Sequence, residues 1–380
     1  MAEKTVVVVG GGVGGIVAAN ELRKRLKHGE RIVLVDRNAR QSFAPSYLWV
    51  MTGARKPEAI TRDLNRLARK GIEIVIGEVQ DIELAERRVT VDGGEIVYDY
   101  AILALGAELV TDAPPGMGLA HTYYNLAGAE RLRNALSTFE GGRIALVVAS
   151  LPYKCPAAPY EGAMLLESYL HERHMRHRAD LAVYTPEAQP LPIAGPALGE
   201  AVCELLAHKG IAFHPGKKLS AVERGELRFE DGTAAPFDLL VAVPGHRAPR
   251  VAQAAGLTDE SGWIPVDPHT LETQHEGVFA IGDVTRVLLP DGLGLPKAGV
   301  FAHGEAIVVA RNIAARIEGQ AEPAAFDGEG SCFLEAGEGV AGVARGNFYA
   351  EPRRIQMRSP SRLWHWGKVT FERYWLWKWY

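Results

Sequence analysis

A glycine-rich loop between a buried strand and a helix constrains this chain more than any other feature of its sequence. Residues 5–9 are all β-branched, the pattern of a strand buried on both faces of a parallel sheet. Gly10, Gly12 and Gly15 follow at once, and apolar residues then recur at helical spacing over residues 16–26. Residues 31–36 predict a second buried strand, so the order predicts a βαβ unit.

The spacing of the three glycines is typical of a loop that binds the pyrophosphate of a dinucleotide. Gly10 would make the tight turn, Gly12 would let the backbone approach the pyrophosphate, and Gly15 would let the helix pack on the strand. The helix N-terminus would supply N–H groups and a positive dipole end. Asp36, at the end of the next strand, would accept hydrogen bonds from ribose hydroxyls. A glycine-rich turn without a ligand is the alternative interpretation.

Two later segments favour FAD over NAD as the dinucleotide. Residues 98–107 (YDYAILALGA) resemble the flavoprotein strand that usually ends in Ala-Thr-Gly, with Leu105 where Thr is usual. Residues 277–283 (GVFAIGD) resemble the second FAD motif of flavoproteins, in which the acidic residue, here Asp283, bonds a ribitol hydroxyl. The three segments follow the order and spacing of that class.

The place of a second glycine loop, after the strand predicted over residues 143–149, contains no glycine. Residues 150–161 read SLPYKCPAAPYE, and their three prolines remove backbone donors. This loop could not cradle a pyrophosphate, so we expect that NAD(P)H is not the reductant. Cys155 stands here instead, beside Lys154 and near a helix start expected at residue 159 or 160, features that lower a thiol pKa. A buried structural cysteine in a turn is the alternative.

The remaining cysteines and the histidines carry weaker signals. Cys332 lies in a predicted strand after the second FAD motif, and the sequence does not show whether it meets Cys155. Cys203 falls on the apolar side of a predicted helix, which favours a place in the core. Three histidines at residues 171, 174 and 177 could touch a metal, but an exposed helix end is the simpler interpretation, and no metal site is predicted.

Several of these segments together resemble one family. Residues 155–161 (CPAAPYE) resemble the redox-cysteine segment of sulfide:quinone oxidoreductases and of the flavoprotein subunit of flavocytochrome c sulfide dehydrogenases. Residues 295–303 (LPKAGVFAH) are similar to the family's Pro-Lys-x-Gly segment by the pyrimidine end of the flavin, and residues 42–46 (SFAPS) resemble its loop near the isoalloxazine ring. The resemblance covers about residues 3–345.

The resemblance implies that Cys155 and Cys332 flank the flavin. Sulfide would attack a disulfide or polysulfide bridge between them, the released thiolate would add to flavin C4a, and two electrons would reduce FAD. Sulfur would leave as polysulfide or persulfide. Lys297 would stabilise negative charge on the reduced flavin, and Glu161 would move protons near Cys155, although an ordinary solvated Glu is the alternative. The predicted FAD-binding residues are Gly10, Gly12, Gly15, Asp36, Arg37, Pro45, Val79, Gly106, Gly282, Asp283, Lys297 and Gly299.

The chain departs from this family at two places. Many sulfide:quinone oxidoreductases have a third redox cysteine, and residues 121–125 (HTYYN) contain none. The flavocytochrome branch attaches FAD through an N-terminal cysteine, and residues 41–43 (QSF) lack one, so the FAD is expected to be non-covalent.

The last twenty residues form a Trp-rich tail. Residues 361–380 contain five of the seven tryptophans, together with Arg362, Lys368, Arg373 and Lys378. Trp and Tyr favour the membrane interface, and basic side chains suit anionic headgroups. No apolar run reaches the roughly 18 to 20 residues that span a bilayer. The tail therefore predicts an amphipathic anchor at the membrane interface, and a tail that packs on its own protein or on a second subunit is the alternative.

These features predict an α/β fold with two Rossmann-like dinucleotide-binding domains and a C-terminal region. The net charge of −4 and the lack of a basic tract argue against nucleic acid as a partner. No signal peptide is visible at the start of the sequence, so the cytoplasmic side of a membrane is the default location. A homo-oligomer is possible, and the sequence does not show whether one forms. The predicted regions are residues 1–107 (first part of the FAD domain), 108–275 (second domain), 276–327 (second part of the FAD domain) and 328–380 (C-terminal region).

The sequence thus predicts a peripheral membrane enzyme that oxidises sulfide to polysulfide or sulfane sulfur and reduces a quinone through a cysteine pair and FAD. Three alternatives remain at this point. They are a sulfide dehydrogenase flavoprotein that reduces a cytochrome c, a type II NADH dehydrogenase, and a non-catalytic flavin-binding subunit.

Overall fold

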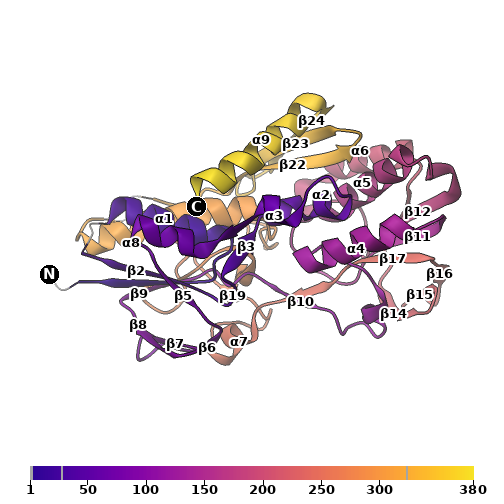
Figure 1. Cartoon of the computed structure of the whole chain (residues 1–380). Helices are drawn as coiled ribbons and strands as arrows, with labels where there is room; N and C mark the ends of the chain where they lie inside the picture. Colours follow the sequence, from indigo (N-terminus) through magenta and orange to yellow (C-terminus); the bar gives the residue numbers. More distant parts are fainter. Residues whose placement is uncertain (1–2, 27–28, 322–323) are drawn as a thin grey trace.

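The first sheet of the computed structural model, which describes residues 3–26, 29–321 and 324–380, has five parallel strands in the order β20-β9-β1-β2-β5 (Figure 1). Val6 and Val8 of β1 pack under α1 and α8, and Val7 and Val9 pack against the β6–β8 sheet on the other face. Both faces are buried, as the β-branched run predicts. The elements of this unit are β1 (Thr5–Val9), α1 (Val13–Arg25), β2 (Arg31–Asp36), β3 (Arg40–Ser42), α2 (Tyr47–Met51), α3 (Pro57–Ile60), β4 (Thr61–Asp63), β5 (Glu73–Ile76), β6 (Val79–Glu83), β7 (Arg88–Val91), β8 (Gly94–Val97), β9 (Tyr100–Leu103), β20 (Val278–Ala280) and α8 (Gly299–Ile317).

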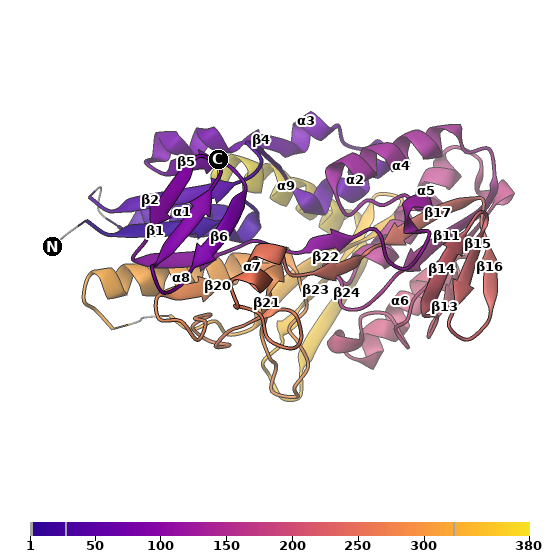
Figure 2. The ribbon, with the colours of Figure 1, turned by 90° about the horizontal axis from the view of Figure 1, so that it is seen from below.

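A second parallel sheet, β13-β12-β11-β17, repeats this plan at the other end of the molecule (Figure 2). Helices α4, α5 and α6 share its core on one side, and the antiparallel strands β14–β16 pack on the other. Strand β17 lies parallel beside β11 as β9 lies beside β1, so the two sheets share this arrangement. Its elements are α4 (Leu126–Thr138), β11 (Gly142–Val148), α5 (Ala158–Glu172), β12 (Ala179–Tyr184), α6 (Pro196–His208), β13 (Ala212–His214), β14 (Leu219–Glu223), β15 (Glu226–Phe229), β16 (Ala234–Pro236) and β17 (Leu239–Val243).

Residues 248–264 follow the second sheet in sequence but pack with the first. Ala252 of α7 (Arg250–Ala254) and Trp263 join the core that contains Val7 and Val9. This packing therefore favours a domain boundary earlier in the sequence than the predicted one at residue 275. We propose that the second domain ends near residue 247, where β10 (Glu108–Val110) pairs with β18 (Gly245–Arg247).

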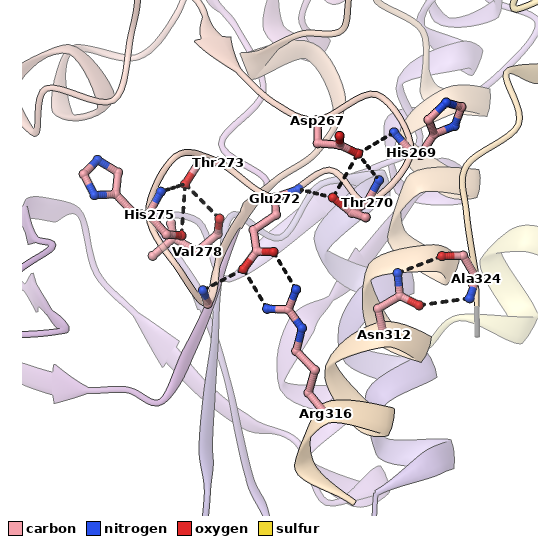
Figure 3. Close-up of polar contacts among 11 residues, drawn as sticks. Asp267, His269, Thr270, Glu272, Thr273, His275, Val278, Asn312, Arg316 and Ala324 are labelled. Atoms are coloured by element: carbon pink, nitrogen blue, oxygen red, sulfur yellow. Dashed lines mark hydrogen bonds and ion pairs between the residues drawn. The ribbon is translucent and has the colours of Figure 1, made fainter. Parts of the chain in front are cut away.

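The segment that leads into β20 is fixed to α8 by polar contacts (Figure 3). Arg316 of α8 donates from both terminal nitrogens to the two oxygens of Glu272, and Glu272 also accepts the N–H of Gly277 at 2.8 Å. Asn312 of α8 exchanges two hydrogen bonds with the backbone of Ala324. The bonds of Glu272 hold the segment before β20 against α8, and those of Asn312 hold the segment that follows α8. The short strands nearby are β19 (Ile264–Pro265) and β21 (Thr285–Arg286).

The C-terminal region is an antiparallel sheet followed by one helix. Strands β22 (Glu329–Gly337), β23 (Val340–Asn347) and β24 (Arg354–Ser361) form the sheet, and α9 (Arg362–Lys378) contains most of the Trp-rich tail. Figure 1 shows α9 extending from this sheet to α1 and α8 of the first domain. The backbone carbonyl of Trp379 accepts a hydrogen bond from Asn20 of α1 at 3.1 Å. The tail is therefore part of the folded protein and bridges two regions.

Two expectations about single residues are wrong. The three histidines do not share a helix, because α5 ends at Glu172 and His174 already has a φ of 56°. Within the described ranges, no group of His, Cys, Asp and Glu side chains could hold a metal ion. Cys203, expected in the core, is only half-buried on α6.

Candidate active site

The residues predicted to bind FAD gather at one edge of the first sheet. Its five strands are parallel, so their carboxyl ends lie side by side, and open parallel sheets bind ligands outside this edge. Across the sheet these residues are Gly282 and Asp283 after β20, Gly106 after β9, Gly10, Gly12 and Gly15 after β1, Asp36 and Arg37 after β2, and Val79 after β5.

The glycine loop has a packed side and an open side. A Cβ on Gly10, whose φ is 108°, would lie 2.3 Å from the carbonyl oxygen of Ala104, and one on Gly15 would lie 1.7 Å from that of Gly10. These two glycines are required by the packing of the chain itself. A Cβ on Gly12 would meet nothing within 4 Å. The open side therefore lies at Gly12, the N-cap of α1, where the pyrophosphate of FAD would fit.

Asp36 is oriented by the same loop. Its Oδ2 accepts the N–H of Gly11 at 2.6 Å, and its Oδ1 accepts the N–H of Asn38 at 2.7 Å. Each carboxylate oxygen can accept a further bond, so Asp36 can also bind ribose hydroxyls. The other predicted contacts are less defined, because Arg37 and Pro45 are exposed and Gly299 begins α8. Their cofactor roles stay predictions.

Asp283 provides a test of whether the site fits FAD. Its Oδ1 is buried and has no hydrogen-bond partner in the described part of the chain. Burial raises the pKa of this carboxyl, and the charges of Lys154 and Lys297 oppose that change. Buried polar atoms are nearly always paired, and a ribitol hydroxyl of FAD would supply a partner. The unpaired oxygen and the open side of the glycine loop together fit this cofactor.

Lys297 lies beside Asp283 but is held by the backbone. Its Nζ donates to the carbonyls of Asp283 and Thr285 at 2.9 Å each and lies 3.4 Å from the centroid of the Trp263 ring. Burial lowers the pKa of Lys297 to about 8, so most molecules still carry the charge at pH 7. One of its three N–H donors remains for the predicted contact with reduced flavin.

Cys155 is held in an unusual backbone conformation at the start of α5. Its φ of 55° lies in the left-handed region, which costs a non-glycine residue about 1 kcal/mol or more. Its N–H donates to the carbonyl of Lys297 at 2.6 Å, and its carbonyl accepts from Ala158 at 2.9 Å. The cysteine of the second domain is thereby joined to the segment that carries the cofactor residues of the first.

The expectation that the pKa of Cys155 is lowered is wrong. Burial raises this pKa well above its ordinary value, and the charges of Glu161 and Cys332 raise it further. The N–H of Ala158 and the charge of Lys368 act in the opposite direction but are outweighed. Lys154 lowers the pKa of both His246 and Asp283 and is not among the main influences on Cys155. A free Cys155 thiol is therefore protonated at neutral pH.

Cys332 on β22 lies near Cys155. The two are free thiols, and a charge on Cys332 is close enough to raise the pKa of Cys155. Cys332 is exposed as a residue, and desolvation of its thiol by the surrounding protein, followed by the charge of Glu161, raises its pKa to about 12. The structure thus brings together Cys155, Cys332 and Glu161, three of the residues predicted to be catalytic.

A buried ion pair adjoins the two thiols. Glu161, only 3% exposed, accepts from Lys368 Nζ at 3.0 Å and from the N–H of Glu335 at 2.9 Å. Glu335 is also buried and pairs with Nδ1 of His365 at 3.1 Å. Glu161 is therefore not the solvated residue that was the alternative interpretation.

Lys368 and His365 are site residues that the sequence reasoning missed. Lys368 was expected to face lipid headgroups, and this is wrong because it is buried against Glu161. A helical projection could have found it, since Lys368, Glu372, Trp375 and Trp379 recur at intervals of three to four residues along one face. The structure buries that face.

The second dinucleotide cradle is filled by side chains of the chain itself. Glu187 follows β12, the strand that corresponds to β2, so its place in the second domain resembles that of Asp36 in the first. Its buried Oε2 accepts from Tyr153 at 2.8 Å, from Tyr160 at 2.7 Å and from Thr185 at 3.1 Å. Tyrosines of the glycine-free loop and of α5 therefore bind one oxygen of the carboxylate that corresponds to Asp36.

Helix α9 has two faces of different character. Its inner face packs on the protein, with the Trp375 ring 5.1 Å from the Phe43 ring and Glu372 paired with Arg55 at 2.9 Å. Its outer face exposes an apolar stripe, in which Trp366 is 62% and Trp377 is 76% exposed. Among the described residues, no helix is both long enough and apolar enough to cross a membrane. The outer stripe consists of Leu363, Trp366, Phe371, Tyr374 and Trp377.

Comparison with protein families gives one match that covers most of the chain. The model of the pyridine nucleotide-disulphide oxidoreductase family matches residues 4–306. This range includes the glycine loop, Cys155, Asp283 and Lys297, but it ends before Cys332.

Individual relatives extend the similarity beyond that range. The mitochondrial sulfide:quinone oxidoreductase of Mus musculus is 25% identical over 91% of this chain and 79% of the mouse protein. The sulfide-quinone reductase of Aquifex aeolicus is 26% identical over 99% of this chain and 91% of its own length, and its crystal structure superposes with a TM-score of 0.89. A type II NADH:quinone oxidoreductase of Haemophilus influenzae is 24% identical over 83% of this chain and 81% of that protein.

Two glycine substitutions separate packing from cofactor binding in the loop. Gly15→Ala is expected to destabilise the apoprotein by about 2–3 kcal/mol, because its Cβ would overlap the carbonyl of Gly10. Gly12→Ala is expected to leave the apoprotein as stable as the wild type but to reduce FAD content severely, because its Cβ enters the open side of the loop. Thermal unfolding and FAD absorbance per protein measure these effects. Full FAD content in Gly12→Ala would contradict this assignment of the open side.

The charge of Lys368 is expected to control the acidity of both thiols. Lys368 lowers the pKa of Cys155 and of Cys332, so Lys368→Met should raise both and slow their alkylation by iodoacetamide. The pH dependence of alkylation, followed by mass spectrometry of each cysteine peptide in the reduced protein, measures the shift. Lys368→Arg should retain the wild-type profile, and Lys378→Met removes an exposed cation from the same helix as a control. An unchanged profile in Lys368→Met would refute this electrostatic role.

Proposed function

This chain belongs to the pyridine nucleotide-disulphide oxidoreductase family, and from that premise we propose that it oxidises sulfide with FAD as its cofactor and transfers the electrons to a quinone. The names of the mouse and Aquifex relatives suggest the substrates. The two cysteines at the FAD edge carry the proposal, because the general fold serves many other reactions.

Cys155 and Cys332 are the groups proposed to bind sulfur. The backbone N–H of Cys155 donates a hydrogen bond to the carbonyl of Lys297. Cys332 is close enough to change the pKa of Cys155. When the two are joined by a disulfide, attack of hydrosulfide on one cysteine sulfur forms a new S–S bond and breaks the bond between the cysteines. The products are a persulfide on one cysteine and a thiolate on the other. FAD supplies the two-electron acceptor that the side chains lack.

The charged residues around the thiols support this chemistry. A freed thiolate is stabilised by Lys368, the cation that lowers the pKa of both cysteines. Glu161 is in contact with that cation and is proposed to hold protons that move to or from Cys155. Lys297 is proposed to balance negative charge at the cofactor, since it is next to Asp283 and remains largely protonated at neutral pH.

The second cradle supports sulfide rather than NADH as the electron donor. The type II NADH dehydrogenase is the alternative that requires a nucleotide in the second domain. Tyr153, Tyr160 and Thr185 already saturate Oε2 of Glu187, and the loop before α5 lacks glycine. A dinucleotide would have to break these buried hydrogen bonds, whose loss costs about 1 kcal/mol or more each.

The outer face of α9 supports a lipophilic electron acceptor. We propose that Leu363, Trp366, Phe371, Tyr374 and Trp377 dock at a membrane interface, with Arg362, Arg373 and Lys378 near anionic headgroups. A quinone dissolved in that membrane would then reach the protein directly, whereas the cytochrome c alternative needs no such surface. The sulfur product, the side of the membrane and association with further copies of the chain stay predictions.

Anaerobic mixing with sulfide tests the proposed reaction. We expect sulfide, but not NADH, to bleach the flavin absorbance of the purified holoenzyme, and we expect a water-soluble quinone to restore it. Cys155→Ser and Cys332→Ser should each lose bleaching by at least a hundredfold because the sulfur bridge cannot form. Cys203→Ser, which replaces the half-buried third cysteine, is the matched control and should react normally. Bleaching by NADH, or full activity in both serine variants, would sink the proposal.

Vesicle flotation tests the docking of α9. Wild-type protein should float with vesicles that contain phosphatidylglycerol, and Trp366→Ala combined with Trp377→Ala should reduce the floating fraction by about tenfold or more, because two exposed anchors are lost. Val97→Ala combined with Leu119→Ala removes apolar side chains that are 63% and 50% exposed elsewhere and serves as the control. Equal flotation of the two double variants would exclude α9 as the docking element.

A further inference from the structure

Two buried side chains near Cys155 have polar atoms without partners. Tyr124 is 5% exposed and His246 is 8% exposed. The hydroxyl of Tyr124 and both ring nitrogens of His246 make no hydrogen bond in the part of the chain that the structure describes. A buried polar group without a partner costs about 1–3 kcal/mol, so a chain that retains two such residues side by side suggests a ligand that binds to both.

The two residues come from different segments that meet beside the thiol. Tyr124 precedes α4, and His246 lies in β18, the strand that links the two domains. Their rings are 5.5 Å apart between centroids and nearly perpendicular, at 70°. Charges on Cys155 and Glu161 raise the pKa of Tyr124, and Lys154 and Lys297 lower that of His246. The charges of the cysteine site therefore act on Tyr124, and those of the two lysines act on His246.

Both groups have the protonation state that a hydrogen-bonding site needs. Burial raises the pKa of Tyr124 well above its ordinary value, so its hydroxyl keeps its proton and can donate. Burial, and then Lys154, lower the pKa of His246 to about 3, so the ring is neutral and has one donor and one acceptor. The backbone carbonyl of Pro244 acts to raise the pKa of His246, but it forms no hydrogen bond with the ring and is outweighed by burial.

We propose that Tyr124 and His246 bind the hydrosulfide ion beside Cys155 and so select it before the attack on sulfur; this inference rests on the proposed function. The ion can accept hydrogen bonds from the hydroxyl and from the ring N–H. Lys154 and Lys297 supply positive charge near this pair, since both lower the pKa of His246. The unpaired Oδ1 of Asp283 is an acceptor and is assigned to FAD instead.

The packing around Tyr124 is consistent with a small ligand. Hydrosulfide has one heavy atom, so it needs about the space of one water molecule. Two rings pack on Tyr124, that of Tyr123, whose centroid is 5.4 Å away, and that of His246. We therefore expect this pair to accept sulfide more readily than a thiol with a carbon chain. The pair would thus determine specificity and position the ion, whereas Cys155 and Cys332 carry the reaction.

Stopped-flow reduction of the FAD-loaded enzyme tests this assignment. Tyr124→Phe and His246→Phe remove the polar atoms and keep aromatic rings. Each should raise the sulfide concentration that gives half-maximal bleaching rate by about tenfold or more, while the limiting rate changes less. Tyr98→Phe removes another buried hydroxyl without a partner, in the core of the first sheet, and should leave that concentration unchanged. Reoxidation of dithionite-reduced flavin by quinone should be the same in all variants.

The outcomes separate this inference from the proposed function. If sulfide does not bleach the wild-type flavin, the proposed function fails and this site fails with it. If the wild type reacts and Tyr124→Phe behaves like Tyr98→Phe, only this site is refuted. A changed flavin spectrum or FAD content with an unchanged sulfide dependence would assign the pair to the cofactor and would also refute it. If His246→Phe does not fold, Tyr124→Phe decides alone, because it removes a single oxygen.

Discussion

The buried ion pair between Glu161 and Lys368 is the contact on which the arrangement of the active site depends. Glu161 belongs to α5 of the second domain and Lys368 to α9 of the C-terminal region, and both are almost fully buried. Two charges in such a place require each other, because removal of one partner leaves an uncompensated charge that costs about 3–5 kcal/mol. This requirement fixes α9 against α5 and β22. The same pair sets the charge around Cys155 and Cys332, so the position of the helix and the acidity of the thiols have one origin.

The two domains have the same βαβ arrangement, but only the first has an open loop where a dinucleotide could bind. In the first domain, Gly12 leaves the N-terminus of α1 open, and Asp36 accepts hydrogen bonds from the backbone N–H groups of Gly11 and Asn38. In the second domain, tyrosines from the corresponding loop and helix bind Glu187. The difference lies in a few side chains and not in the topology, because β11 and β12 pair in parallel as β1 and β2 do. The second domain retains the frame of a nucleotide site and uses the loop to hold a cysteine.

Local patterns predicted the first sheet, its glycine loop and the two parallel domains, because each depends on residues that are neighbours in the sequence. The same holds for Asp36, the last residue of β2, and for Asp283, which lies shortly after β20. The pattern could not reveal that residues 248–264 return to the first core, or that Tyr124 meets His246, since those contacts join distant segments. The prediction that the pKa of Cys155 is lowered was wrong for a related reason. A helix start and a neighbouring lysine are visible in the sequence, whereas the burial that outweighs them is not.

The two faces of α9 connect the cysteine site to the outer surface across a single helix. Lys368 contacts Glu161 on the inner side, and Trp366, two residues earlier, is exposed on the outer side. A helix with its side chains is about 10–12 Å across, so a lipid interface at the outer stripe would lie about that far from the charged cluster. That separation is small compared with the dimensions of a protein of 380 residues. It favours an acceptor that resides in the membrane, because such an acceptor could approach the site without leaving the lipid. The exposed tryptophans and the buried lysine thus lie on opposite faces of the same helix, which links the proposed membrane surface to the cysteine site.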